Sequence, residues 1–211
     1  MTYLLRLVLP DRPGMLGAVA TALGRAGADI VSLDVVERGP DGAVDDLLVQ
    51  LPSGGLADVL ITSARSVEGV VVESLRPYLG ADDLHRDLEL VDEVAAAPSE
   101  ALQLLAEHAP GVFRAGWAVV MDGAASVASS SGAPETGDLV VPPTPQARRV
   151  EPVEAWVPER WHQLGVELVA APVGGPHLVV LVGRPGGPRF RASEVARLAH
   201  LAGIVATVQD G

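Results

Sequence analysis

The 211-residue sequence contains no cysteine and no lysine, and aromatic residues make up only 3% of it. Without cysteine, the chain has no disulfide, no thiolate metal ligand and no cysteine nucleophile. The few aromatic side chains leave little surface on which nucleic-acid bases stack. A formal net charge of −12 repels a phosphate backbone. The sequence therefore predicts no nucleic-acid partner.

Long hydrophobic runs are also missing. No apolar stretch approaches the roughly 18 residues that a membrane-spanning helix needs. The N-terminus passes directly into an alternating strand pattern, without the basic and apolar regions of a signal peptide. The lack of cysteine fits a reducing compartment. We therefore expect a cytoplasmic protein that does not contact a membrane.

Motifs that carry chemistry are absent as well. The sequence has no nucleophile motif and no glycine-rich phosphate loop, and three adjacent serines at 129–131 lack a matching histidine and acid. None of the five histidines has a neighbour at metal-site spacing; they are His85, His108, His162, His177 and His200. The sequence therefore predicts no catalytic residue, no metal site and no cofactor, and hence a protein that is not an enzyme.

Hydrophobic residues, by contrast, are abundant. They form 48% of the chain, and the mean hydropathy is +0.31, which indicates well-buried cores. The length allows two domains. Residues 1–80 form a first segment, and the stretch 81–97 is an acidic linker with a helical pattern of leucines. Residues 98–211 form a second segment, with a flexible Ser/Pro-rich loop at about 129–152.

The first segment alternates between strand and helix patterns. Apolar residues follow strand or helix spacing in turn, and glycine and proline separate the runs. The pattern predicts strands at 3–9, 29–37, 44–51 and 70–75, and helices at about 16–26 and 56–66. The order βαββαβ fits a four-stranded antiparallel sheet with two helices on one face. The other face then needs cover, from a second copy or from the second segment.

The sharpest local signal is the turn Asp11-Arg12-Pro13-Gly14-Met15-Leu16 between the first strand and the first helix. Pro13 fixes φ, and Gly14 permits a positive φ. Such a turn leaves N–H groups at the helix start without partners, which makes a small anion-binding seat. The same residues also fit a tight connection without a ligand, in which Asp11 caps the helix.

Residues 3–76 resemble an ACT domain. The resemblance rests on the opening strand, the Asp-x-Pro-Gly turn at 11–14, the helix segment Val19-Ala20-Thr21-Ala22-Leu23, and Gly27-Ala28-Asp29-Ile30. It implies a ferredoxin-like βαββαβ domain that serves as a regulatory module and binds an amino acid where two copies pair. Some ACT domains have only a structural role.

The resemblance also implies where a ligand lies. Backbone amides near Gly14 would hold a ligand carboxylate, and the start of the second strand would line the opposite side. This strand often begins with Asn in the family, whereas here it begins with Asp29, which would favour an α-amino group or repel an acidic ligand. The predicted ligand-binding residues are Asp11, Arg12, Pro13, Gly14, Met15, Leu16, Asp29, Ile30, Val31, Ser32 and Leu33.

The second segment is predicted to contain a helix from Pro98 to about Gly111, a hairpin around Asp122-Gly123, strands at 166–171 and 178–182, and a terminal helix capped by Ser193. The run 178–184, then Gly187-Pro188-Arg189-Phe190, then 193–199 resembles the end of a GAF domain. The resemblance implies an α/β sheet domain flanked by helices, with a pocket for a small molecule.

Together, these observations predict an α+β protein, with an ACT domain followed by a GAF-like domain. The favoured function is a non-enzymatic sensor that binds a small metabolite, preferably an amino acid, as a homodimer. The alternative is a ligand-independent adaptor or regulatory subunit that acts through a protein partner.

Overall fold

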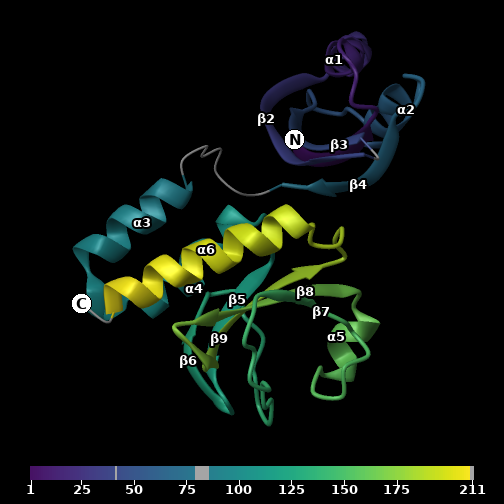
Figure 1. The fold of residues 1–211 in the computed structure, drawn as a ribbon. Coiled ribbons are helices and arrows are strands. Elements are labelled where there is room, and N and C mark those ends of the chain that lie inside the picture. Colours follow the sequence, from purple (N-terminus) through teal and green to yellow (C-terminus); the bar gives the residue numbers. More distant parts are fainter. Residues whose placement is uncertain (41, 79–85, 210–211) are drawn as a thin grey trace. The chain divides into compact units, whose positions relative to one another are not determined.

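The computed structural model describes residues 1–40, 42–78 and 86–209. The chain divides into two compact units, Met1–Asp82 and Asp83–Gly211 (Figure 1). Each unit has its own β-sheet and its own hydrophobic core.

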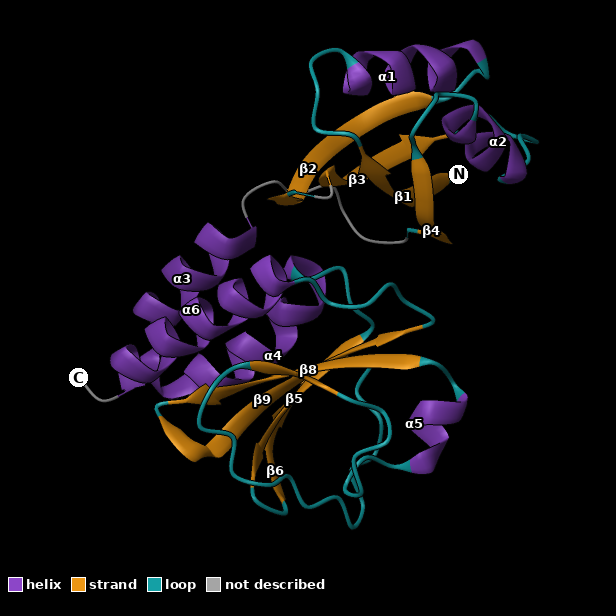
Figure 2. Cartoon of the chain, turned by 45° about the vertical axis from the view of Figure 1, so that its right-hand side comes forward, coloured by secondary structure: helices purple, strands orange, loops and turns teal. Residues whose placement is uncertain are grey.

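The first unit has the predicted βαββαβ order. Its elements are β1 (Thr2–Leu9), α1 (Met15–Arg25), β2 (Asp29–Gly39), β3 (Gly42–Gln50), α2 (Asp58–Arg65) and β4 (Val71–Pro77). The four strands form an antiparallel sheet in the order β2-β3-β1-β4, and both helices cover the same face (Figure 2). The predicted sheet and helix layer are confirmed.

The core of the first unit lies between this sheet face and the helices. Alternate residues of the two central strands point toward the helices, because strand side chains alternate between faces. Leu5 and Leu7 of β1 and Leu47 of β3 pack there against Met15, Val19 and Leu23 of α1. Gly27 ends α1 with φ +79°, and the Ala28 N–H bonds to the Leu23 carbonyl, as in a Schellman C-cap.

The opposite face of this sheet carries a charged pair at its centre. Arg6 of β1 lies directly across from Asp46 of β3. Arg6 donates from Nε and Nη2 to the two Asp46 carboxylate oxygens, each at 2.7 Å, and both residues are buried. This bidentate geometry satisfies both carboxylate oxygens of Asp46.

The second unit is built on a five-stranded sheet. Its elements are α3 (Arg86–Ala96), the 3₁₀ turn η1 (Pro98–Glu100), α4 (Ala101–Val112), β5 (Trp117–Asp122), β6 (Ala125–Ser129), β7 (Arg148–Val150), α5 (Glu159–Gln163), β8 (Val166–Val173), β9 (Gly175–Pro185) and α6 (Ala192–Gln209). The strand order is β6-β5-β9-β8-β7, and each pair is antiparallel. The unit is therefore α+β and not α/β as predicted, because parallel βαβ crossovers do not build the sheet.

Three helices cover one face of this sheet (Figure 2). α4 and α6 pack on the sheet, and α3 packs on both of them through the buried Leu90 and Val94. In the predicted acidic linker 81–97, residues 81–85 lie outside the described structure and residues 86–96 form α3. The predicted helical pattern of leucines does not account for this packing, because Leu88 is exposed and Leu90 and Val94 form the buried stripe instead.

An irregular segment and α5 cover the other face. The predicted loop 129–152 is irregular for most of its length and includes the short strand β7, but Leu139 and Val141 are buried against the sheet. Trp117 of β5 and Trp161 of α5 lie in the same layer, with ring centroids 4.9 Å apart. Both faces of the second sheet are therefore filled by apolar side chains.

A bidentate ion pair holds the chain after β7. The Arg148 guanidinium donates to Glu154 at 2.6 and 2.8 Å, and the Trp156 indole N–H donates to the same carboxylate. The hydrogen bond from Arg148, followed by smaller contributions that include Trp156, lowers the pKa of Glu154 to about 2. Ionised Glu154 therefore stabilises the folded state at neutral pH, and this contribution is lost as the pH falls from 4.5 toward 2.

Arg184 of β9 forms a second, fully buried cluster. Its guanidinium donates to the Phe113 carbonyl and to Glu194 Oε1, both at 2.6 Å, and stacks over the Phe190 ring at 3.9 Å. Glu194 Oε2 accepts the Arg191 N–H at the start of α6, at 2.8 Å. This cluster joins β9, the end of α4 and the start of α6.

Two predicted helix ends differ from the structure. Ser193 lies inside the first turn of α6 and its hydroxyl has no partner, because Glu194 takes the capping role that Ser193 was predicted to fill. α4 continues through Pro110 to Val112. In the last turn of a helix, the missing proline N–H removes one hydrogen bond without breaking the helix.

The Arg184 cluster yields a stability prediction. Glu194→Ala leaves the Arg184 guanidinium without its carboxylate and removes a cap, so we expect the second unit to lose about 3 kcal/mol of unfolding free energy. All three tryptophans lie in this unit, so their fluorescence during urea unfolding reports on it. The control is Glu151→Ala, which removes an exposed ion pair with Arg189 and should cost less than about 0.5 kcal/mol. Equal effects of the two variants would contradict the prediction.

Candidate functional site

The predicted turn lies at the end of β1, and Gly14 is the N-cap of α1. Gly14 has φ +89° and ψ −12°, a left-handed conformation that glycine adopts without strain. The first intrahelical bond runs from the Ala18 N–H to the Gly14 carbonyl, at 2.9 Å. The Pro13-Gly14 pair therefore reverses the chain directly from β1 into α1.

The start of α1 is uncapped and open. No side chain of the described residues makes a capping hydrogen bond there. The Leu16 and Gly17 N–H groups precede the first intrahelical bond, so they have no acceptor in the helix. A Cβ atom built on Gly14 or Gly17 would meet no other atom within 4 Å. Free N–H groups, room and the positive end of the helix dipole together provide a place for an anion.

The charged residues of the turn are exposed. The predicted capping role of Asp11 is not seen, because α1 has no side-chain cap. Arg12 lies close to the helix start, where its Nε is 3.2 Å from Met15 Sδ. Met15 itself is buried in the core, and Leu16 is partly exposed.

The second group of predicted ligand residues lies on β2, which is an edge strand. Asp29 is opposite Gln50, which is opposite Thr2 at the beginning of β1. The turn follows Leu9 at the other end of β1, seven residues and therefore about 23 Å away along the strand. Leu33 is level with Leu5, about 13 Å from the end of β1. A single copy of the chain therefore does not bring the two groups together.

The structure adds a residue that sequence reasoning missed. Asp45 of β3 lies opposite Leu7 of β1 and Val35 of β2, on the face that the helices cover. Its side chain is buried, and its Oδ1 has no hydrogen-bond partner among the residues that the structure describes. Burial raises the pKa of Asp45, with smaller contributions from Asp46 and Asp11, whereas Arg38 lowers it. The contribution of Asp11 places Asp45 near the turn.

A signal for Asp45 exists in the sequence. Two acids, Asp45 and Asp46, interrupt an otherwise apolar central strand. Because neighbouring strand residues face opposite ways, one of the two must point into the helix layer. The sequence does not say which one, since that depends on the strand register.

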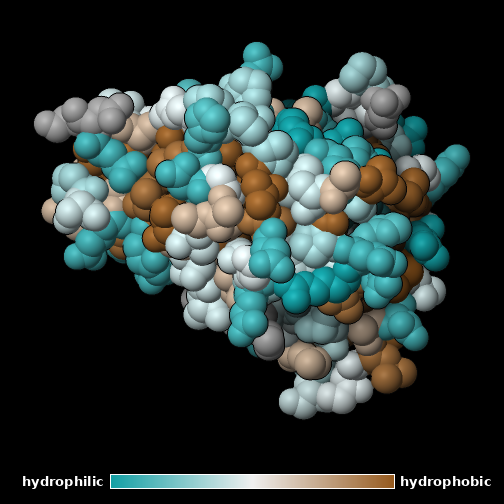
Figure 3. Space-filling model, turned by 90° about the horizontal axis from the view of Figure 1, so that it is seen from below, coloured by the Kyte–Doolittle hydropathy of each residue, from teal (hydrophilic) through white to brown (hydrophobic). Residues whose placement is uncertain are grey.

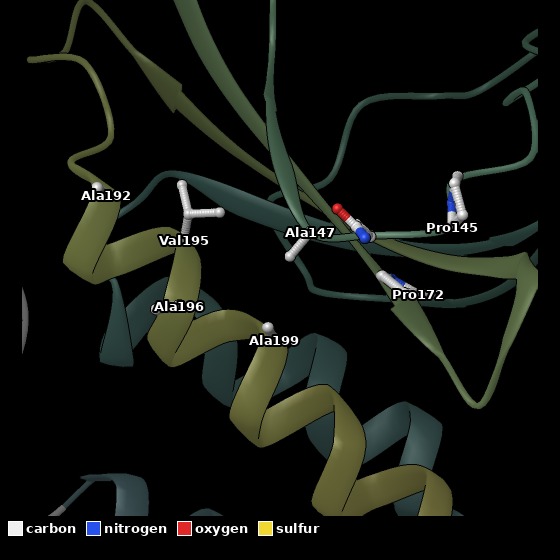
Figure 4. Close-up of a pocket in the computed structure, with 8 residues that line it drawn as sticks. Pro145, Ala147, Pro172, Ala192, Val195, Ala196 and Ala199 are labelled. Carbon is white, nitrogen blue, oxygen red and sulfur yellow. The ribbon is translucent and has the colours of Figure 1, made fainter.

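The second unit offers a groove at the edge of its helix layer (Figure 4). It has a volume of about 470 Å³ and lies between the first half of α6 and the sheet edge. Small apolar side chains form most of its lining, which comprises Pro145, Gln146, Ala147, Pro172, Ala192, Val195, Ala196 and Ala199. The groove is apolar and contains no charged group, so its lining offers dispersion contacts and little directional recognition.

Other exposed apolar side chains are scattered among hydrophilic ones on the face seen in Figure 3. Within residues 1–40, 42–78 and 86–209, no three metal-binding side chains come together. Over the same ranges, no helix has the length and apolarity to cross a bilayer.

Comparison with known protein families assigns most of the first unit to a family. Residues 3–73, about a third of the chain, match the ACT domain family. With the observed βαββαβ sheet, this part of the chain is an ACT domain. ACT domains commonly act as regulatory modules for small molecules such as amino acids. The match ends before the region that the sequence predicts to be GAF-like.

Solved structures provide more distant similarities. A formyltetrahydrofolate deformylase from Pseudomonas putida KT2440 is 13% identical, with a TM-score of 0.31; the match covers 46% of this chain and 39% of the deformylase. An unknown protein from Galdieria sulphuraria is 11% identical over 99% of this chain and 91% of its own, with a TM-score of 0.34. The regulatory subunit of aspartate kinase from Thermus flavus is 13% identical over 95% and 92%, with a TM-score of 0.29. No curated protein matches significantly.

Asp45 yields a prediction on stability and pH. Its pKa in the folded state is raised above the ordinary value for an aspartate by burial, so at pH values above that ordinary pKa the folded protein binds more protons than the unfolded chain. Stability contributed by this residue therefore falls as the pH rises through that window. At pH 7 we expect Asp45→Asn to stabilise the first unit by about 1 kcal/mol.

The measurement is urea unfolding by circular dichroism at pH 7 and pH 3, with tryptophan fluorescence separating the transition of the second unit. The gain should disappear at pH 3, where both side chains are neutral. A variant that is less stable than the wild type at pH 7 would contradict this prediction.

Proposed function

We propose that the ACT domain binds a small metabolite, specifically an amino acid, and that the protein is a regulatory sensor and not an enzyme. The observation that carries the proposal is the uncapped, open start of α1 at Gly14. The N–H groups of Leu16 and Gly17 would bond the ligand carboxylate. Charge-assisted hydrogen bonds of this kind contribute about 1.5–3 kcal/mol each, which suits a ligand sensed at micromolar to millimolar concentration.

The proposed site is completed by a second copy of the chain. The predicted ligand residues of β2 extend from Asp29, at the far end of the sheet from the turn of the same copy, to Leu33 at the middle of the sheet. In a two-fold dimer, β2 of one copy would approach the turn of the other. β2 supports this pairing because it is an edge strand, with its backbone free on one side and with Val31 and Val35 exposed.

The second unit would report ligand occupancy as a GAF-like domain. Its last strand β9, the bend at Gly187 and Pro188, the buried Phe190 and the closing helix α6 follow in the order on which the resemblance rests. The apolar groove beside α6 is a candidate for its small-molecule pocket or for contact with a protein partner.

A thermal-shift screen against the twenty amino acids at millimolar concentration tests the ligand proposal. We expect at least one to raise the melting temperature by binding the folded state. Gly14→Asp should abolish this shift, because it places a carboxylate at the seat. The matched control is Gly54→Asp, since Gly54 has φ +87° and similar open space but lies beyond the end of β3, away from the turn.

Two results would count against ligand binding. The first is no shift with any amino acid, which favours the ligand-independent adaptor. The second is an equal loss of the shift in both glycine variants. For the adaptor, a stoichiometric protein partner should be retained from cell extract without added metabolite.

The dimer proposal has its own test. The chain has a mass of 21.8 kDa, and multi-angle light scattering at micromolar concentration should report twice this value. A monomeric mass that does not change when amino acids are added would contradict pairing, because the two parts of the site are separated in one copy.

A further inference from the structure

We propose that Asp45 binds the ammonium group of the ligand, so that the site selects α-amino acids over carboxylic acids that lack the amino group. This inference rests on the proposed function, because it supplies the second half of the site at the start of α1. It assigns to Asp45 a role that the turn and β2 do not provide within one copy of the chain.

The position of Asp45 supports the assignment. Asp45 faces the helix layer two residues along β3 from Ala43, which pairs with Leu9 at the end of β1. Leu9 leads into the turn, and Leu7, the partner of Asp45, packs in the same core as Met15, the first residue of α1. The side chain of Asp45 therefore lies on the α1 side of the sheet, at the end where α1 begins.

The cost of leaving Asp45 unpaired is the second argument. A buried carboxylate oxygen without a partner loses its hydration and gains nothing in exchange, and such atoms are rare in folded proteins. The neighbouring acid shows the usual solution, since Asp46 is buried to a similar extent and is satisfied by Arg6 at two distances of 2.7 Å. Asp45 Oδ1 has no such partner. An arriving ammonium group would pair it.

The charged groups around Asp45 leave its carboxylate available to an ammonium group. Arg38 lies on the neighbouring strand opposite Ala43 and acts on Asp45 through its charge, but no hydrogen bond or ion pair joins them in the part of the chain that the structure describes. Arg38 is exposed. Asp46 points to the other face and Asp11 is exposed on the turn, so both leave a negative potential at Asp45 that favours a cation.

The two halves of the proposed site match the two charges of a zwitterion. The uncapped N–H groups of α1 suit a carboxylate, and Asp45 suits an ammonium group. A ligand with the carboxylate alone would leave Asp45 unpaired and would bring a second negative charge close to it. A ligand that leaves a buried polar group of the site unpaired typically binds much more weakly than a ligand that pairs it.

The test is a double-mutant cycle between protein and ligand, measured by isothermal titration calorimetry on the full chain. The probes are the amino acid with the largest thermal shift and the matching carboxylic acid in which hydrogen replaces the ammonium group. Removing the ammonium group should weaken binding to the wild type at least about tenfold. For Asp45→Asn, the two probes should bind within about twofold of each other. Asp45→Ala repeats the comparison of the two probes in a variant whose side chain has no amide that could bond the ligand.

The matched control is Glu37→Gln, which removes one negative charge from β2 at a position opposite Val44, on the face away from the helices. This variant should keep the tenfold discrimination. If Asp45→Asn and Asp45→Ala also keep it, the role of Asp45 is overturned while the proposed function stands. If no amino acid binds the wild type, the proposed function fails and this inference fails with it.

Discussion

The alternation of side chains along β3 is the constraint on which the ACT domain depends. One face of this strand must fill the core beneath α1, and the other lies on the helix-free side of the sheet. Two adjacent acids therefore point in opposite directions. Asp46 meets Arg6 directly across the sheet, and the pair is satisfied. Asp45 enters the helix layer, and among residues 1–40, 42–78 and 86–209 its buried Oδ1 has no hydrogen-bond partner, which makes the end of the sheet near the turn the chemically unusual part of the unit.

The same end of the sheet contains the start of α1. Helix and strand run in opposite directions over one another, so the turn at Gly14 and the beginning of β2 are separated by the length of the sheet. A binding site that uses both must combine two copies, whereas a site formed by the helix start and Asp45 lies within one copy.

The second unit differs from the ACT domain in that both faces of its sheet are covered. Helices fill one face of its sheet, and an irregular segment with α5 fills the other. Arg184 is buried among the Phe113 carbonyl, Glu194 and Phe190, where it fixes the start of α6. The groove described for this unit lies at the edge of α6. The unit therefore has a packed interior, and its groove lies at the periphery.

The sequence by itself determined the order of elements in the ACT domain, because the change from strand to helix period at Pro10–Gly14 and the glycine at 27 are local signals. It also marked the turn as a candidate site. The burial of Leu139 and Val141 in a Ser/Pro-rich stretch escaped sequence reasoning, because their partners are distant in the chain. Only the tertiary structure decided which of Asp45 and Asp46 faces the helices and how far Asp29 lies from Gly14. Both follow from strand register, which long-range pairing sets and local pattern does not.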